Sequence, residues 1–308
     1  MILLENKSKK PVLLIAWKRP EHLKKVIKSL RFYQPSKVYF ACDGAREDIE
    51  EKIKVEKTRS IIDNEVDWPC KIYKLIRDRN KGCKIAVSEA ISWFFSENDE
   101  GIILEDDCVP NPFFYNYCEE LLNRYRNNKN IISISGNNFQ EGNFIGDGSY
   151  YLSKYTHIWG WASWSDRWSL YDINIKNWPD FKKTKKYKEL FNSSRERNYW
   201  RKIFDNLFFN EKPNTWDYQW LFTSFFYNMN TVLPNTPLVE NIGYDNDSTH
   251  IFSDRELKKQ ISNGNKLQLV KKLKEPKSLE RSLVADKYSF ENHYSKNLYR
   301  RIIDKLLN

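Results

Sequence analysis

The sequence has few cysteines and no long hydrophobic segment. The cysteines are odd in number, form no CxxC pair and have no histidine at ligand spacing, and they are Cys42, Cys70, Cys83, Cys108 and Cys118. This pattern argues against a disulfide framework and against a zinc site. No run of 18 apolar residues occurs, and the first ten residues mix acids and bases, so we expect neither a transmembrane helix nor a signal peptide. These absences favour a soluble, cytoplasmic protein.

The chain also lacks internal repeats, low-complexity segments and an evenly spread charge. Its 308 residues carry a net charge of +10, and the segment from Arg255 to the end holds 14 basic and 6 acidic residues. The rest of the chain is therefore nearly neutral, which argues against binding of nucleic acid by the body of the protein. With 40% apolar and 15% aromatic residues, the chain can build a substantial core. The length predicts about two domains, or one large α/β domain with an appendage.

Short apolar runs alternate with helix-period segments through the first 135 residues. Pro11–Ala16 is apolar throughout, as expected of a strand buried on both faces, and Pro20–Leu30 repeats apolar residues at helical spacing. Further strands are expected at 37–41, 71–76, 101–104 and 131–134, and helices at 46–62, 87–94 and 111–125. This alternation predicts an α/β fold with a Rossmann-like, doubly wound and mainly parallel sheet.

The character of the sequence changes after Gly136. The region 149–178 is crowded with aromatic residues and has little periodicity, as expected of loops that line a cleft, and helices are expected at 195–209 and 217–226. We therefore divide the chain into one domain over residues 1–253, with halves at about 10–135 and 136–253, and a basic helical extension over 254–308. In the extension, Leu298, Ile302 and Leu306 would form an apolar stripe on a final basic helix. This stripe would either contact the inner face of an anionic membrane or pack on the protein itself.

Three acidic residues, Glu105, Asp106 and Asp107, directly follow the apolar strand expected at 101–104. Adjacent carboxylates at the end of a buried strand repel one another unless a positive charge lies nearby. A hard divalent cation, held by one or two carboxylates together with water and phosphate oxygens, suits this arrangement. The alternative is a solvated acidic turn. Because ligands of open α/β sheets bind at the carboxyl ends of strands, we favour a metal site.

This segment, Leu104-Glu105-Asp106-Asp107, resembles the DXD region of GT-A-fold glycosyltransferases, in the form found in inverting N-acetylglucosaminyltransferases. A bacterial branch of that superfamily is similar in four further segments, which are 12–23 (VLLIAWKRPEHL), 157–168 (HIWGWASWSDRW), 215–220 (TWDYQW) and 241–250 (NIGYDNDSTH). The resemblance covers residues 10 to 250. It implies a GT-A fold and a metal-dependent inverting transfer from a nucleotide-diphosphate sugar, UDP-linked in our reading, to a glycan or lipid-linked hydroxyl.

The resemblance also implies roles for residues near the expected strand ends. The donor nucleotide would lie along Ala16, Lys18 and Arg19, with Asp43 at the base or ribose and Arg79 and Lys81 near the donor. For Asp43, simple turn chemistry in Asp-Gly is the alternative, and for Arg79 and Lys81 it is an exposed basic loop. Asp107 would coordinate Mn²⁺ or Mg²⁺, with Glu105 and Asp106 at the ribose or at metal-bound water. His250 would add a metal ligand or a diphosphate contact, and an imidazole ligand would favour Mn²⁺.

An inverting transfer needs a base for the acceptor hydroxyl, and Asp217 is our candidate. Its alternative role is to stabilise the start of the helix expected at 217–226, and one carboxylate can do both. Trp159 and Trp161 would stack on sugar rings, with Gly160 permitting close approach, whereas core packing is the alternative for these rings.

Two other function classes remain open from the sequence. A sugar-1-phosphate nucleotidyltransferase is also an α/β protein with acidic metal ligands, but it needs a glycine-rich loop after its first strand, and 16–20 contains no glycine. A non-catalytic protein that binds RNA or another anionic polymer would carry basic residues across its body, whereas the surplus lies in the tail. The sequence specifies neither the sugar nor the acceptor.

Overall fold

The protein is described by a computed structural model over residues 9–243 and 273–295. Its first half alternates strands and helices, namely β1 Val12–Ala16, α1 Pro20–Tyr33, β2 Lys37–Cys42, α2 Ile49–Glu65, β3 Lys71–Ile76, α3 Gly82–Glu97, β4 Glu100–Glu105, β5 Cys108–Pro110, α4 Pro112–Tyr125 and β6 Ile131–Ser135. The expected elements of this half are therefore present. The second helix begins three residues later than expected, because the Asp48 side chain accepts a hydrogen bond from the Glu51 amide and caps α2.

The second half contains short strands and a helical layer. It comprises β7 Tyr150–Ser153, β8 Trp161–Trp164, α5 Ser165–Trp168, α6 Trp178–Phe181, α7 Lys185–Glu189, α8 Ser194–Asn210, α9 Asp217–Tyr227, β9 Asn230–Pro234, β10 Val239–Asn241, α11 Leu283–Ser289 and the π-helical turn η1 Phe290–Tyr294. The region expected to be loop-rich thus contains two strands, β7 and β8. Each has only four residues, all of them buried, and so shows no alternation for a pattern to reveal.

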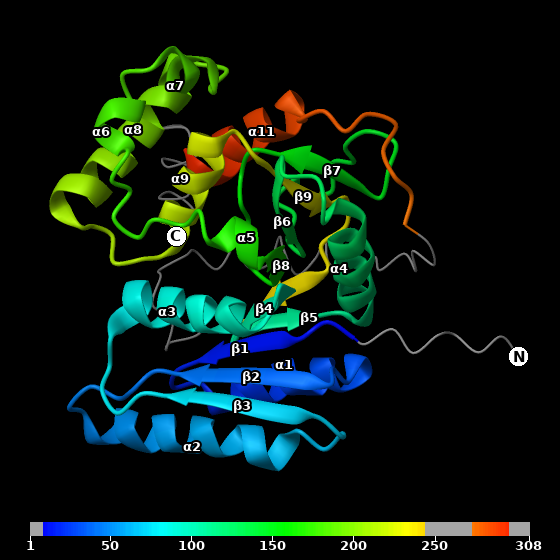
Figure 1. Ribbon diagram of the computed structural model, residues 1–308, viewed down its shortest axis with the longest axis vertical. Helices are drawn as coiled ribbons and strands as arrows, with labels where there is room; N and C mark the ends of the chain where they lie inside the picture. The colour runs from blue at the N-terminus through cyan, green and yellow to red at the C-terminus, as the bar shows by residue number, and fades with distance from the viewer. Residues whose placement is uncertain (1–8, 244–272, 296–308) are drawn as a thin grey trace, which may run out of the picture.

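The strands of both halves join in one eight-stranded sheet of order β3-β2-β1-β4-β8-β6-β9-β7 (Figure 1). Neighbouring strands are parallel in the β3-β2-β1-β4 block and between β6 and β9, and antiparallel where β8 and β7 join. The fold is therefore mixed α/β with a mainly parallel sheet, as predicted. Since β4 and β6 both run antiparallel to β8, their carboxyl ends lie at the same edge of the sheet.

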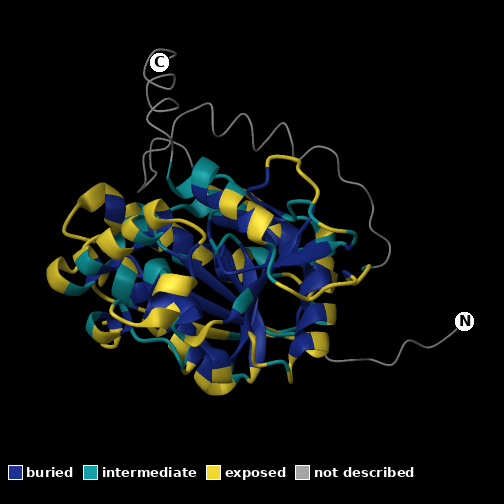
Figure 2. Cartoon of the chain, turned by 90° about the horizontal axis from the view of Figure 1, so that it is seen from above, coloured by how far each residue is buried: buried dark blue, intermediate teal, exposed yellow. Residues whose placement is uncertain are grey.

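The alternation of side chains along each strand supplies two separate cores. Val12, Leu14 and Ala16 point to the face covered by α1, α2 and α4, whereas Leu13 and Ile15 point to the face covered by α3. A third core joins α6, α7, α8 and α9 through aromatic side chains. Figure 2 shows the buried strands at the centre and exposed residues on the outward faces of the helices. Both faces of the sheet are thus covered, which leaves its carboxyl edge open for a site.

The boundary expected after residue 253 does not separate all of the C-terminal segment from this body. Arg281 pairs with Leu152 beside β7, the Ser282 amide donates to the Leu152 carbonyl at 2.8 Å, and Phe290 is buried in the third core. The stripe of Leu298, Ile302 and Leu306 lies outside the described residues. Within the described residues, no helix is long and apolar enough to cross a bilayer.

Candidate functional site

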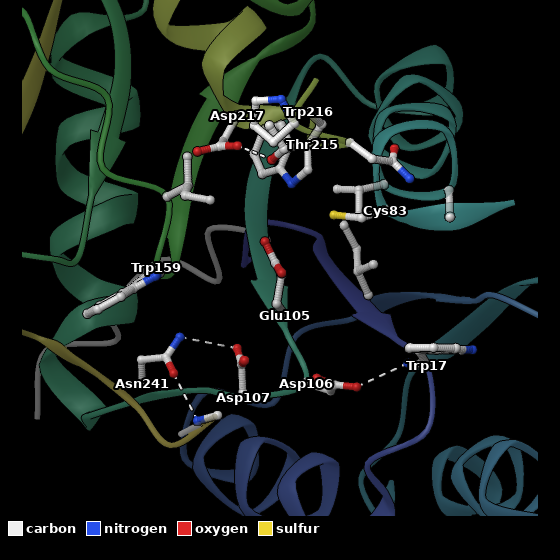
Figure 3. Close-up of a pocket in the computed structure, with 18 of the residues that line it drawn as sticks. Trp17, Cys83, Glu105, Asp106, Asp107, Trp159, Thr215, Trp216, Asp217 and Asn241 are labelled. Atoms are coloured by element: carbon white, nitrogen blue, oxygen red, sulfur yellow. Dashed lines mark hydrogen bonds between the residues drawn. The ribbon is translucent and has the colours of Figure 1, made fainter. Parts of the chain in front are cut away.

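A cavity of about 880 Å³ opens at the carboxyl edge of the sheet, between the two halves of the chain (Figure 3). The first half contributes the residues that follow β1, β2, β3 and β4, and the second half contributes the segments after β6 and before β8, the start of α9, and η1. Of the residues predicted for the site, those that line the cavity are Ala16, Lys18, Arg19, Asp43, Glu105, Asp106, Asp107, Trp159 and Asp217. Residues as far apart in the chain as Ala16 and Asp217 thus share one space.

The two aspartates of the acidic triplet share the Arg19 guanidinium, which lies 3.6 Å from Asp106 Oδ1, and differ in their other contacts. The Asp106 Oδ2 atom accepts a hydrogen bond from the Trp17 amide at 3.0 Å, and the Asp107 Oδ2 atom pairs with the Arg19 guanidinium at 2.6 Å. The segment after β10 closes over Asp107, because the Ile242 amide donates to its carbonyl at 2.8 Å. A Cβ atom on Gly243 would lie 2.1 Å from the Asp107 carboxylate, so only glycine permits this approach. Asp107 is therefore fixed from two sides.

Glu105 occupies the centre of the cavity. Its side chain points from the end of β4 toward Thr215 and Asp217, as Figure 3 shows. Burial raises the pKa of Glu105 well above its ordinary value, and the charges of Asp107, Asp106 and Asp217 raise it further, whereas Arg19 opposes them. One guanidinium therefore does not balance the negative charge that gathers at this point.

This excess of negative charge is the observation that fits a divalent cation. Within the described residues, no group of three or more His, Cys, Asp or Glu side chains is arranged to hold a metal ion by itself. Mg²⁺ and Mn²⁺ suit a different donor set, in which one or two carboxylates are completed by water and by phosphate oxygens of a substrate. Asp107, with Asp106 and Glu105 beside it, can supply the carboxylates of such a set. His250 lies outside the described residues.

Asp43 organises the loops after β2 and β3. Its carboxylate accepts hydrogen bonds from the amides of Gly44, Lys81 and Gly82 at 2.9 to 3.2 Å. Gly44 is required for the same closure, because a Cβ atom there would lie 2.3 Å from the backbone of Arg79. These contacts position the loop that leads into α3. The side chains of Arg79 and Lys81 are exposed and do not line the cavity, whereas the buried Arg77 lines it and pairs with Glu89 at 3.0 Å.

A platform of one indole ring and two cations forms the wall next to this loop. The Trp17 indole donates its N–H to the Gly44 carbonyl at 2.9 Å, and Lys18 and Arg46 lie 4.4 and 4.7 Å from the centre of its ring. Both cations also pair with the buried Glu51. Burial alone would raise the pKa of Glu51, but the hydrogen bonds from Arg46 and Lys18 outweigh it and lower the pKa to about 2. This end of the cavity is therefore flat, polar and rich in cations.

Asp217 is positioned by the tryptophans on either side of it in the sequence. Trp216 and Trp220 are buried against Trp161 of β8, with ring centres 5.7 Å apart in both pairs. Because these rings hold the start of α9 against the sheet, Asp217 faces the cavity and accepts a hydrogen bond from the Thr215 hydroxyl. Trp161 itself is 1% exposed and packs in this aromatic cluster instead of lining the cavity.

The far end of the cavity is aromatic. His293 of η1 stacks on Phe139, with ring centres 3.7 Å apart, and Trp159 and His157 meet the same phenyl ring edge-on. Gly160, at φ +63°, leaves room for Val239, whose side chain a Cβ atom would approach to 2.7 Å. Gly160 therefore serves the packing beneath this end and does not itself line the cavity.

Several lining residues were not predicted as site residues, among them Trp17, Arg46, Arg77, Asn137, Thr156, His157, His293 and Tyr294. Two of them, Trp17 and Asn137, had an available signal. Trp17 and Asn137 follow strands expected at 11–16 and 131–134, and polar or aromatic residues just after parallel strands are candidates for a site. His293 and Tyr294 had none, since only the fold brings η1 to the cavity.

Comparison with known proteins yields little. No protein-family model and no curated protein matches this chain. Among solved structures, HddC from Yersinia pseudotuberculosis is similar with 10% identity and a TM-score of 0.29, over 51% of this chain and 77% of HddC. WbbM, a bifunctional glycosyltransferase, is similar with 13% identity and a TM-score of 0.33, over 85% of this chain and 45% of WbbM. This chain thus spans less than half of WbbM. Similarity at this level does not assign a function to this chain.

Proposed function

We propose that this protein is a metal-dependent, inverting glycosyltransferase of GT-A type that uses a nucleotide-diphosphate sugar. We propose UDP as the nucleotide of this donor. One observation supports this most strongly. An acidic triplet at the end of the central strand β4 and a separate carboxylate, Asp217, face one cavity that also holds a platform of cations. A transfer from a charged donor to a hydroxyl needs these three parts, namely a site for the diphosphate, a site for the metal and a base.

The charged end of the cavity suits the donor. Lys18, Arg19 and Arg46 offer positive charge to a diphosphate, and the Trp17 ring offers a flat surface beside them. A Mn²⁺ or Mg²⁺ ion held by Asp107, with Asp106 and Glu105 beside it, would neutralise the charge on the departing diphosphate. Arg19 pairs with Asp107 in the structure, so it is placed to pass from this carboxylate to a phosphate oxygen when the donor arrives.

Asp217 suits the role of base. In an inverting transfer, the bond between the anomeric carbon and the diphosphate oxygen breaks as the acceptor oxygen bonds to the opposite face of that carbon. The acceptor's hydroxyl proton passes to the Asp217 carboxylate, and the electron pair of the broken bond leaves with the diphosphate. The first turn of α9 and the tryptophans around it hold this carboxylate in place, across the cavity from Asp107.

The experiment is a screen of nucleotide sugars for turnover, with water or an added alcohol as acceptor, in Mn²⁺ or Mg²⁺. We expect the wild-type protein to release nucleoside diphosphate from at least one donor, with inversion at the anomeric carbon seen by NMR. Asp217→Asn keeps the size of the side chain but removes the proton acceptor, so turnover should fall by ~10²- to 10⁴-fold while donor binding persists. A well-folded Asp217→Asn protein with normal turnover, or retention at the anomeric carbon, contradicts the proposal.

A further inference from the structure

Three of the residues that line the cavity each carry a buried polar atom with no hydrogen-bond partner among the described residues. These atoms are the Nδ2 atom of Asn137, the Oγ1 atom of Thr156 and the Nε2 atom of His157. The three residues are 3%, 7% and 3% exposed, and all three line the cavity. Asn137 follows β6, and Thr156 and His157 lie on the segment that enters β8, so two separate parts of the fold contribute them.

Such atoms are costly to leave unpaired. A buried donor or acceptor without a partner destabilises a fold, and most buried polar atoms in proteins therefore have partners. Replacing Thr156 by valine or His157 by a phenyl ring would remove this cost with little change of shape. Three such residues in the lining of one cavity are expected of a site that is completed by the hydroxyl groups of a ligand.

The surfaces next to these atoms are aromatic rings. Phe139, Trp159, Tyr199, Tyr218 and Tyr294 line this end with His293, and the described lining residues from 137 to 159 and in η1 include no Lys, Arg, Asp or Glu. Burial lowers the pKa of His157 well below its ordinary value, so its imidazole is neutral at pH 7. Flat apolar faces beside neutral donors and acceptors match a sugar ring, which has C–H faces and a rim of hydroxyl groups.

From this juxtaposition we infer that the aromatic end of the cavity is an acceptor subsite for a neutral sugar ring, whose hydroxyl groups bind Asn137, Thr156 and His157. The inference rests on the proposed function in that the bound ring would present a hydroxyl to Asp217. It adds the substrate class, which is an uncharged glycan residue in preference to a uronic acid, a phosphorylated sugar or a non-carbohydrate alcohol. It also assigns the three residues that select this class.

The test is direct binding of methyl glycosides to the full-length protein, followed by saturation-transfer NMR. The probes are the methyl β-pyranosides of glucose, galactose and N-acetylglucosamine, with methyl β-glucuronide as the anionic counterpart. We expect at least one neutral glycoside to bind, and to bind more tightly than the glucuronide. Thr156→Val should weaken that binding by ~10-fold, the loss of about one hydrogen bond, while the melting temperature stays equal or rises. His157→Phe should weaken it to a similar extent.

Thr58→Val is the matched control. The Thr58 hydroxyl is buried in α2, donates to the Lys54 carbonyl at 2.8 Å and does not line the cavity, so its loss should leave glycoside binding unchanged. Equal affinity of wild type and Thr156→Val for the neutral glycosides, or tighter binding of the glucuronide, overturns the inference. So does wild-type protein that binds UDP but no neutral glycoside, a result that leaves the proposed function standing. Glycoside binding that depends on Thr156 without any binding of UDP supports the subsite and contradicts the proposed function.

Discussion

The two ends of the cavity differ in how their polar groups are satisfied. At the charged end, Asp43 accepts from three amides, Asp107 pairs with Arg19, and Glu51 pairs with Lys18 and Arg46. At the aromatic end, buried atoms of Asn137, Thr156 and His157 lack partners among the described residues. The charged end is thus assembled before any ligand arrives, whereas the aromatic end is complete only with one.

This difference has a chemical consequence. An anion that enters the charged end must take cations from carboxylates that already hold them, so its net gain is smaller than the number of cations suggests. A neutral ligand at the aromatic end breaks no ion pair and satisfies atoms that otherwise stay unpaired. Affinity for the donor should therefore depend on charge, and affinity for the acceptor on shape and hydrogen bonding.

The largest expected effect concerns the support of the aromatic wall. Behind it, Lys154 pairs with Glu196 at 2.6 Å, and Asp286 of α11 accepts from the Ser153 hydroxyl at 2.6 Å and pairs with Arg281 at 3.2 Å. Burial raises the pKa of Asp286 from 3.8 to about 6, against the opposing effect of Lys154. Because the folded-state pKa is raised, the stability linked to this proton is present below pH 3.8 and is lost as the pH rises through about 6.

Asp286→Asn should remove this dependence. The free energy of unfolding of wild type, relative to that of Asp286→Asn, should fall by about 2 kcal/mol between pH 4 and pH 7, from the size of the shift. Urea unfolding of both proteins at a series of pH values measures it. A difference that stays constant, or that grows with pH, would show that Asp286 is charged in the folded protein throughout.

A smaller effect distinguishes the two ends directly. Because salt screens charges at the cavity mouth, the affinity for UDP should fall by about 3- to 10-fold between 50 and 500 mM NaCl. The affinity for a neutral methyl glycoside should stay constant. Titrations of both ligands at the two salt concentrations make the comparison. Equal salt dependence for both would remove the distinction between a charged and a neutral end.

Sequence patterns predicted the first half of the fold well, because its strands are separated by helices of regular periodicity. They also placed Glu105–Asp107 and Asp43 after strands, and these side chains share the cavity. The second half of the fold was harder to predict from the sequence. Strands such as Trp161–Trp164 are short and buried throughout, so a row of tryptophans that builds a core resembles one that lines a cleft.

The unpredicted part of the site comes from long-range packing. Trp161 was expected at a sugar and lies in the cluster that holds α9, whereas Thr156 and His157, a few residues earlier, line the cavity. Which side of this segment faces the cavity depends on the antiparallel pairing of β8 with β4, and local sequence does not encode that pairing. In the same way, η1 reaches the cavity because residues after 273 pack on β7.

The central claim is that the acidic triplet binds a nucleotide diphosphate together with a metal ion. Calorimetric titration of UDP into wild type and Asp107→Ala, with Mn²⁺ and with chelator, tests it most directly. We predict that Mn²⁺ tightens binding to wild type by about 10-fold or more, and has no such effect on Asp107→Ala, which keeps the cations but loses the carboxylate. Equal affinity with metal and with chelator, in both proteins alike, would contradict the account.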